Sequence, residues 1–326
     1  MATYSVAIST RFSNAGVGTL VKPEYWVPAI EMDLPAYSIW PQFVGERYGD
    51  VEVFGQGRGQ YFHINVMADL PLGGTTALLS GTKVSAANSS GLTQVTGTIK
   101  EYGYSEALEA FQSWLANADM QKASAVSMAR NAMLTRNYLI GATFIGNTTN
   151  YFVCDGTGSA SKGTYTGTRG TNPISPDHVR QIASELRRLG VAPFPDGYYR
   201  WVGAPGMFDS LKAQSEVYSS ASALNIEGIY SLGDLFKFGG FIFVEEFGPH
   251  AVTTYSATVG TTVVFGNNAV VGGDDFASPG LVRYYADHEQ DFGRKGLIGW
   301  VAHAGYTRPV DGTANGRTWL VYSKGA

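Results

Sequence analysis

The chain contains the stretch YSEALEAFQSWLANADMQKASAVSMARNAMLTRNYLI at residues 104–140. These 37 residues include neither glycine nor proline, although the whole chain of 326 residues has 41 glycines and 13 prolines. Ser105 suits an N-cap, and apolar or small side chains recur at helical spacing at Leu108, Phe111, Leu115, Ala118, Ala125, Ala129 and Ala132. The stretch therefore predicts one long helix of roughly 55 Å, longer than a compact domain of this size needs.

The segment at residues 1–50 is broken by four prolines and carries eight aromatic side chains. Prolines at this spacing forbid a long helix and favour extended pieces. Such a segment cannot build its own core, yet its aromatic side chains need burial. We therefore expect an arm that packs on a neighbouring subunit, with candidate contacts at Tyr25, Trp26 and Trp40. Packing on the arm's own domain is the alternative that composition leaves open.

Residues 51–103 predict a long two-stranded excursion. Tyr61–Val66 and Val95–Tyr102 are rich in β-branched and aromatic residues, as strands are. The sequence between them includes the polar stretch GGTTALLSGTKVSAANSSG, which has no helical period. A long hairpin of this kind is marginal alone in water and needs a partner to pack against.

The remaining chain predicts a small α+β module followed by returning strands. Residues 146–174 have the Gly and Thr content of a loop or short hairpin. Ser175 then caps a helix with Pro176 in its first turn, an apolar face at Val179, Ile182, Leu186 and Leu189, and a stop at Gly190. A strand at Tyr198–Val202 and a short helix opened by Pro205 follow. Further strands are expected at Phe236–Val244, Val259–Phe265, Leu297–Tyr306 and Thr318–Tyr322, with a turn signal at Asn315-Gly316 between the last two.

Composition narrows the classes of function. Charged residues make up 15% of the chain, against about 25% in typical soluble domains, so a monomer would expose much apolar surface and tend to associate. The formal net charge of −4 argues against a dedicated nucleic-acid binder. No apolar run approaches the roughly 18 residues that span a membrane, and the first residues do not resemble a signal peptide. Cys154 is the single cysteine, which suits a reducing compartment.

Catalytic and metal-binding patterns are not recognisable. The sequence has no P-loop and no paired-Cys or HExxH zinc pattern. Adjacent Asp274 and Asp275 would point to opposite faces of a strand rather than to one ion, and Cys154 has no recognisable base near it in the sequence. The first turn of a helix makes His178 a capping or solvated residue. We therefore predict no catalytic, cofactor-binding or metal-binding residues and no enzyme activity.

Five stretches together resemble a known family. They are ARNAMLTRNYLIGATF (129–144), SPDHVRQIASELRRLGV (175–191) with DGYYRWVGAPGMFDSLK (196–212), GGFIFVEE (239–246) leading to AVVGGDDF (269–276), and DFGRKGLIGWVAHAGYTRP (291–309). In this order and spacing, over nearly the whole length, the chain resembles the tailed-phage major capsid proteins, whose fold herpesvirus capsids share. The resemblance implies an α+β fold with an N-terminal arm (1–50), an extended hairpin loop (51–103), the spine helix of a peripheral domain (104–145), a Gly/Thr-rich connection (146–174), an axial domain (175–280), and strands returning to the peripheral domain (281–326).

The function implied by the resemblance is structural. Copies would form pentamers and hexamers of an icosahedral shell around phage DNA, which they would contact without sequence readout, in a virion assembled in the host cytoplasm. Scaffolding, portal and decoration proteins are further expected partners; no cofactor and no membrane are implied. Lys83 lies in the expected loop, through which some family members cross-link covalently. The alternatives are the shell of an encapsulin-like bacterial nanocompartment, and a β-rich enzyme or sugar-binding protein.

Overall fold

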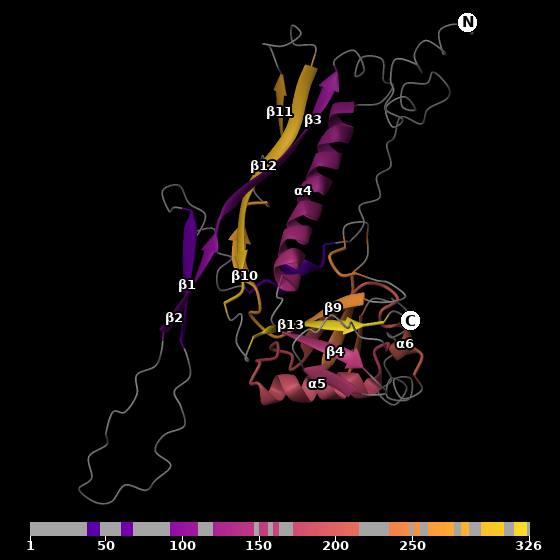
Figure 1. The fold of residues 1–326 in the computed structure, drawn as a ribbon. Coiled ribbons are helices and arrows are strands. Elements are labelled where there is room, and N and C mark those ends of the chain that lie inside the picture. Colours follow the sequence, from indigo (N-terminus) through magenta and orange to yellow (C-terminus); the bar gives the residue numbers. More distant parts are fainter. Residues whose placement is uncertain are drawn as a thin grey trace, which may run out of the picture. The chain divides into compact units, whose positions relative to one another are not determined.

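The computed structural model describes residues 38–45, 60–67, 92–109, 120–146, 150–155, 159–162, 172–214, 235–246, 248, 251–254, 260–276, 282–286, 295–309 and 316–324. The chain divides into two compact units (Figure 1). In its described parts, the first unit draws on Lys100–Asn137 and Asp274–Ala304, and the second on Ile39–Ile99, Tyr138–Gly273 and the chain after Gly305. No described helix is long and apolar enough to cross a membrane.

Strand β12 (Lys295–Thr307) is the centre of a four-stranded sheet with β3 (Lys100–Glu109), β10 (Val271–Asp274) and β11 (Val282–Ala286). Strands β3 and β11 both pair with residues 296–300 of β12, so they lie on its opposite edges. Side chains of β12 alternate between the two faces of the sheet: Ile298, Trp300, Ala302 and Ala304 are buried, whereas Leu297 and Val301 are exposed. Helix α4 (Met120–Ile145) lies along this sheet (Figure 1) and covers its buried face. There Trp300 Nε1 donates to Asn131 Oδ1 at 3.0 Å.

The long helix begins later than the sequence predicts. It starts at Met120 rather than Tyr104, and residues 100–109 form β3 in ten paired positions with β12. The absence of glycine and proline permits a helix but does not require one. Tyr102 and Tyr104 suit a strand, and the ladder with β12 satisfies the backbone groups that a helix would otherwise have satisfied. Ser105 is therefore a strand residue opposite Gly299 and not an N-cap. Residues 110–119 lie outside the described residues.

A seven-stranded sheet forms the second unit, in the order β5-β4-β13-β9-β6-β8-β7. Its strands are β4 (Tyr151–Asp155), β5 (Ser159–Lys162), β6 (Tyr199–Gly203), β7 (Leu235–Phe238), β8 (Phe241–Glu245), β9 (Gly260–Phe265) and β13 (Thr318–Ser323). Phe241 and Phe243 of β8 join a core that includes Val179, Ile182 and Leu186 of α5 (Pro176–Arg188). The alternate residues Ile242 and Val244 join a second core with Trp40 and Phe144. Both faces of the sheet are thus buried, which explains the continuous apolar run FIFV.

The segments that follow α4 enter the two sheets as follows. The stretch expected as a connection supplies the β4–β5 hairpin, and β4 pairs with β13. Of the two expected final strands, β12 lies in the first unit's sheet and β13 in the seven-stranded sheet, so they do not form a hairpin around Asn315-Gly316. The expected strand Phe236–Val244 is the β7–β8 hairpin, because Gly239 and Gly240 both adopt positive φ, as a two-residue hairpin turn requires.

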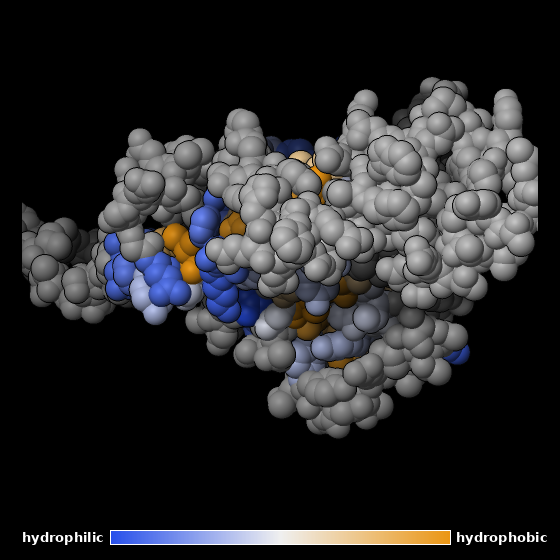
Figure 2. All heavy atoms as spheres, turned by 90° about the horizontal axis from the view of Figure 1, so that it is seen from above, coloured by the Kyte–Doolittle hydropathy of each residue, from blue (hydrophilic) through white to orange (hydrophobic). Residues whose placement is uncertain are grey.

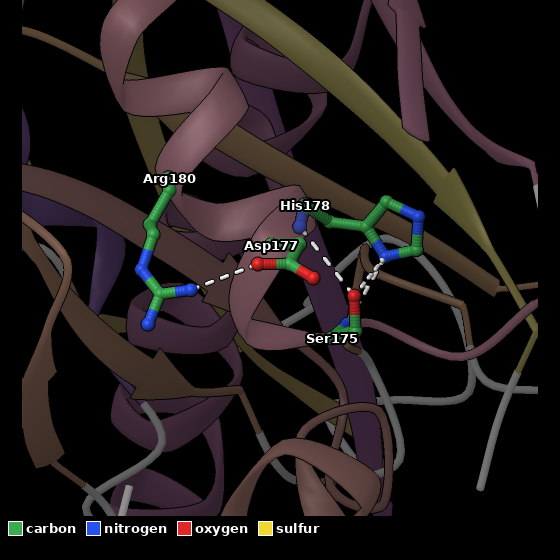
Figure 3. Close-up of polar contacts among 4 residues, drawn as sticks. All are labelled: Ser175, Asp177, His178 and Arg180. Carbon is green, nitrogen blue, oxygen red and sulfur yellow. Dashed lines mark hydrogen bonds and ion pairs between the residues drawn. The ribbon is translucent and has the colours of Figure 1, made fainter. Parts of the chain in front are cut away.

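The predicted N-terminus of α5 is confirmed, and Figure 3 shows its capping box. His178 Nδ1 accepts the N–H of Ser175 at 3.1 Å, and Ser175 Oγ accepts the N–H of His178 at 3.4 Å. His178 is 1% exposed, so its role is capping and not solvation. An exposed ion pair of Asp177 with Arg180, at 2.8 Å, also lies in this turn.

Replacing Ser175 with alanine is expected to lower the free energy of unfolding by about 1 kcal/mol, because it removes the side-chain acceptor at the helix start. Chemical denaturation followed by circular dichroism measures the change. The matched control is Arg180→Ala, which breaks only an exposed ion pair and should cost about 0.5 kcal/mol or less. Equal effects of the two substitutions would contradict the cap.

Gly141 lies within helix α4 at a position where a side chain would have no room. A Cβ on Gly141 would lie 2.7 Å from Trp40 Nε1 and 2.7 Å from Val252 Cγ2. Gly141→Ala would gain about 1 kcal/mol of helix propensity but force overpacking that costs about 1–3 kcal/mol. We expect a net loss of thermal stability, measured as a lower Tm, whereas Ser127→Ala in the same helix should not lower it. A higher Tm for Gly141→Ala would show that Trp40 can move aside at little cost.

Candidate functional site

Trp40, expected to contact a neighbouring subunit, is instead a core residue of its own chain. It begins the short 3-10 helix η1 (Trp40–Phe43), and its side chain is 0% exposed. The indole ring stacks on Phe144 of α4 with ring centroids 5.0 Å apart. A side chain enclosed in this way has no surface left for a neighbour, so this expectation is wrong for Trp40. Tyr25, Trp26 and Lys83 lie outside the described residues.

A buried carboxylate holds Trp40 in place. Glu246 follows β8, and its Oε1 accepts the indole N–H of Trp40 at 2.6 Å. The other oxygen, Oε2, accepts the N–H and the hydroxyl of Thr253 at 2.8 and 2.7 Å. A buried carboxylate is tolerated when donors satisfy it, and these three bonds tie η1 to the end of β8 and to residue 253. This role of Glu246 was not predicted from the sequence, where Glu246 is the second of two acidic residues that follow the apolar run FIFV.

The face of the β3–β12 sheet away from α4 exposes apolar side chains. Val301 is 54% exposed and Leu297 is 40% exposed. Their partners on β3 are Gly103 and Ala107, which are too small to cover them. Figure 2, a view of the molecule from above, shows hydrophobic residues beside hydrophilic ones among the described residues. Exposed apolar surface of this kind is a candidate contact for another protein.

Helix α4 exposes a second apolar stripe within the first unit. Val126 and Met133 are both exposed and lie seven residues, or about two turns, apart on the same side of the helix. Together with Leu297 and Val301, they add exposed apolar side chains to the first unit, in a chain with few charges.

Strand β3 is the edge of its sheet among the described strands. It pairs with β12 and with no other described strand. Tyr104 is 56% exposed although it lies opposite buried Trp300. Burial raises the pKa of the neighbouring Tyr102 phenol, in keeping with its position on the α4 side of the sheet. The edge of β3 is therefore a third feature open to a partner.

The expected hairpin is confirmed at its base, but the expected strand Val95–Tyr102 is divided between β2, which ends at Thr98, and β3, which begins at Lys100 in the other sheet. Strands β1 (Tyr61–Met67) and β2 (Leu92–Thr98) pair antiparallel over their whole length, from Tyr61↔Thr98 to Met67↔Leu92. Phe62 lies directly over Gly97, where an added Cβ would come 2.0 Å from the ring, and it also lies close to Gly305. The aromatic ring between two glycines fixes the root of the hairpin. Residues 68–91 lie outside the described residues.

The titratable residues considered in the sequence have separate structural partners. Asp274 accepts from Arg136 Nε at 2.9 Å, whereas Asp275 contacts His303 Nδ1 at 2.9 Å. The prediction that the two carboxylates diverge is confirmed. His63 contacts the Thr96 hydroxyl across the hairpin, and Cys154 is buried in β4. In the described part of the chain, no three His, Cys, Asp or Glu side chains gather in a group that could hold a metal ion.

Comparison with known proteins identifies the fold but no sequence family. No protein-family model matches the sequence, and no curated protein matches it. Among solved structures, the chain is similar to the capsid of Ralstonia phage GP4, with 13% identity and a TM-score of 0.66 over 94% of this chain and 96% of that chain. The chain has the fold of bacteriophage capsid proteins.

Two further structures agree with this fold. The head structure of Helicobacter pylori bacteriophage KHP40 matches with 16% identity and a TM-score of 0.65, over 93% of this chain and 95% of that chain. The capsid of cyanophage Pam1 matches with 13% identity and a TM-score of 0.62, over 94% of this chain and 97% of that chain. The expected α+β capsid fold is thus confirmed.

Proposed function

We propose that this chain is the major capsid protein of a tailed bacteriophage and that many copies form the icosahedral shell around the genome. The observation that carries the proposal is the end-to-end capsid fold, which covers 94% of this chain and 96% of the GP4 capsid chain. A fold alone does not fix function. The first unit exposes apolar side chains, and only 15% of the chain's residues are charged. Burial of this apolar surface between copies would favour assembly.

The parts of the chain take the following roles in this proposal. The seven-stranded unit with α5 is the axial domain, and the unit with α4 and β12 is the peripheral domain. The β1–β2 hairpin is the extended loop, and the chain before Ile39 is the arm. Symmetric repetition of contacts between these parts closes a shell through pentamers and hexamers.

The proposed partners are copies of the same chain, packaged DNA bound without sequence readout, and scaffolding, portal or decoration proteins. Its proposed location is the virion, after assembly in the host cytoplasm, and its role is structural rather than enzymatic. A bacterial nanocompartment shell is not favoured, because the similar structures named above are phage capsids.

Sedimentation velocity and negative-stain microscopy of the purified protein test the proposal. Pentamers, hexamers or closed shells are expected. A stable monomer at micromolar concentration across a wide range of salt and crowding conditions would overturn it.

A further inference from the structure

Strand β3 has a free edge among the described strands. It pairs with β12 along one edge only, and all of residues 100–107 except Tyr102 are exposed. In an antiparallel pair, alternate residues turn their N–H and C=O groups away from the partner, so the edge of β3 away from β12 presents a row of such groups. Main-chain hydrogen bonds to an added strand would satisfy these groups, and this is a common mode of protein recognition.

The face of β3 on the α4 side carries two opposite charges and two aromatic rings. They belong to Lys100, Tyr102, Tyr104 and Glu106, which follow one another at every second position of the strand and therefore share one face. Their partners on β12 are all buried. Lys100, Tyr104 and Glu106 are nevertheless exposed, so this margin of the sheet is open to side chains of a further strand.

The β3 strand of a second copy is an edge of the same kind, and symmetry restricts how two such edges can pair. A two-fold axis perpendicular to the sheet makes the two strands antiparallel and keeps the α4 side of both copies on one side. Residues directly opposite each other in an antiparallel pair share a face, and either both or neither of them exchange hydrogen bonds. Even-numbered residues of one copy must therefore lie opposite even-numbered residues of the other.

One of the allowed registers matches the charges of both strands. It places Lys100 of each copy opposite Glu106 of the other copy, and Tyr102 opposite Tyr104. The neighbouring allowed registers place Lys100 opposite Tyr104 or opposite Leu108, so each of them loses both ion pairs. Opposite-charge pairs and aromatic pairs at directly opposed positions stabilise a sheet, and only this register has both kinds twice.

We propose that the β3 edges of two copies pair with each other across a two-fold axis, with Lys100 opposite Glu106 and Tyr102 opposite Tyr104. The inference rests on the proposed shell function, because the two-fold axes of an icosahedral shell bring two copies together in this relation. The contact joins the two four-stranded sheets into one continuous sheet. It uses the same surface on both copies, so it links copies two by two and leaves the β3 edge covered.

Charge reversal tests the register. Glu106→Lys would place two lysines opposite each other at both ends of the contact, and Lys100→Glu would place two glutamates there. Each single variant is expected to raise the protein concentration needed for assembly by about threefold, while shells still form at higher concentration. The double variant Lys100→Glu/Glu106→Lys restores opposite charges and should assemble at the concentration that the unmodified chain needs. A double variant that assembles no better than the single variants would overturn the register.

Disulfide trapping in assembled particles tests the pairing itself. In the proposed register, Glu101 of one copy lies opposite Ser105 of the other, at the Cα spacing of about 4.5–5.5 Å that an antiparallel pair has and a disulfide allows. Within one strand the same two residues are about 13 Å apart. A chain carrying Glu101→Cys/Ser105→Cys can therefore link these two positions only to another copy. After mild oxidation, a dimer is expected on a non-reducing gel, with the buried Cys154 unchanged.

The matched controls are the two single cysteine variants. Glu101→Cys alone and Ser105→Cys alone should give no dimer, because each cysteine would lie opposite an unmodified residue. A dimer from Ser105→Cys alone would overturn the register, since Ser105 would then lie opposite itself. Shells of the double variant without any link would overturn the edge pairing while leaving the proposed function intact. Failure of the unmodified chain to form shells would overturn both.

Discussion

Replacing Trp40 with alanine is expected to lower the free energy of unfolding by about 3–5 kcal/mol, because a large side chain leaves the centre of a packed core. The substitution removes the ring that stacks on Phe144 and lies 6.2 Å from Phe265, centroid to centroid. It also deprives Glu246 Oε1 of the indole donor. Denaturant melts followed by tryptophan-independent far-UV circular dichroism measure the change.

The control Trp40→Phe separates packing from hydrogen bonding. It keeps an aromatic ring in the core but removes the N–H, so its cost should be about 1–3 kcal/mol, the cost of an unsatisfied buried polar group. If Trp40→Ala costs less than about 1 kcal/mol, η1 is not part of the core and Trp40 regains its place as an intersubunit contact.

Truncations that end on either side of Trp40 should behave differently for the same reason. Removing residues 1–37 leaves η1 intact, and the shortened chain should keep a cooperative melt while failing to close shells. Removing residues 1–50 also takes Trp40, Phe43 and the bridge of Gly45 to Val271, so this chain should fail to fold. Similar melts for both truncations would contradict the core position of η1, and normal shells without residues 1–37 would show that the arm contributes little to assembly.

Charging the exposed face of the β3–β12 sheet is expected to abolish assembly without unfolding the protein. In the variant Val301→Glu, a carboxylate replaces a side chain that is more than half exposed, so the free energy of unfolding should change by about 0.5 kcal/mol or less. In a shell, the same carboxylate would be buried in an apolar contact, which costs several kcal/mol in each repeated interface. Sedimentation velocity measures the fraction of shells, which should fall below detection.

The matched control is Lys100→Glu, which changes charge at an exposed position on the same sheet but on its α4 side. It should retain a substantial fraction of shells. Normal assembly of Val301→Glu would show that this face points to solvent in the particle, and the contact surface would then have to lie along Val126 and Met133 of α4.

Elements specified by neighbouring residues could be predicted from the sequence, and elements specified by distant partners could not. Ser175, Pro176 and Gly190 fix α5 locally, so its N-terminus and its apolar face were predicted. The start of α4 depends on β12, nearly two hundred residues later in the chain, because β12 pairs with residues 100–109 and so makes them a strand. The fate of Trp40 depends on Glu246 and Phe144 in the same way. The composition around Trp40 indicated only that this side chain needs burial. Burial against a neighbouring subunit and burial in the chain's own core are both compatible with that composition.

The exposed apolar face of the β3–β12 sheet also depends on residues that are distant in the sequence. Low charge content indicated that the chain associates, but the residues that expose apolar area became identifiable only from the register of β3 against β12. Gly103 and Ala107 leave Val301 and Leu297 uncovered because of their paired positions, and no local motif marks these four residues.

Cryo-electron microscopy of particles assembled from the purified chain is the decisive test of the proposed shell function. Closed icosahedral shells are expected, with repeating density that fits the seven-stranded unit and the β3–β12–α4 unit of this chain, and with density for Trp40 inside its own subunit. A homogeneous monomer or small open oligomer under every assembly condition, or shells whose subunit density does not fit these two units, would contradict it.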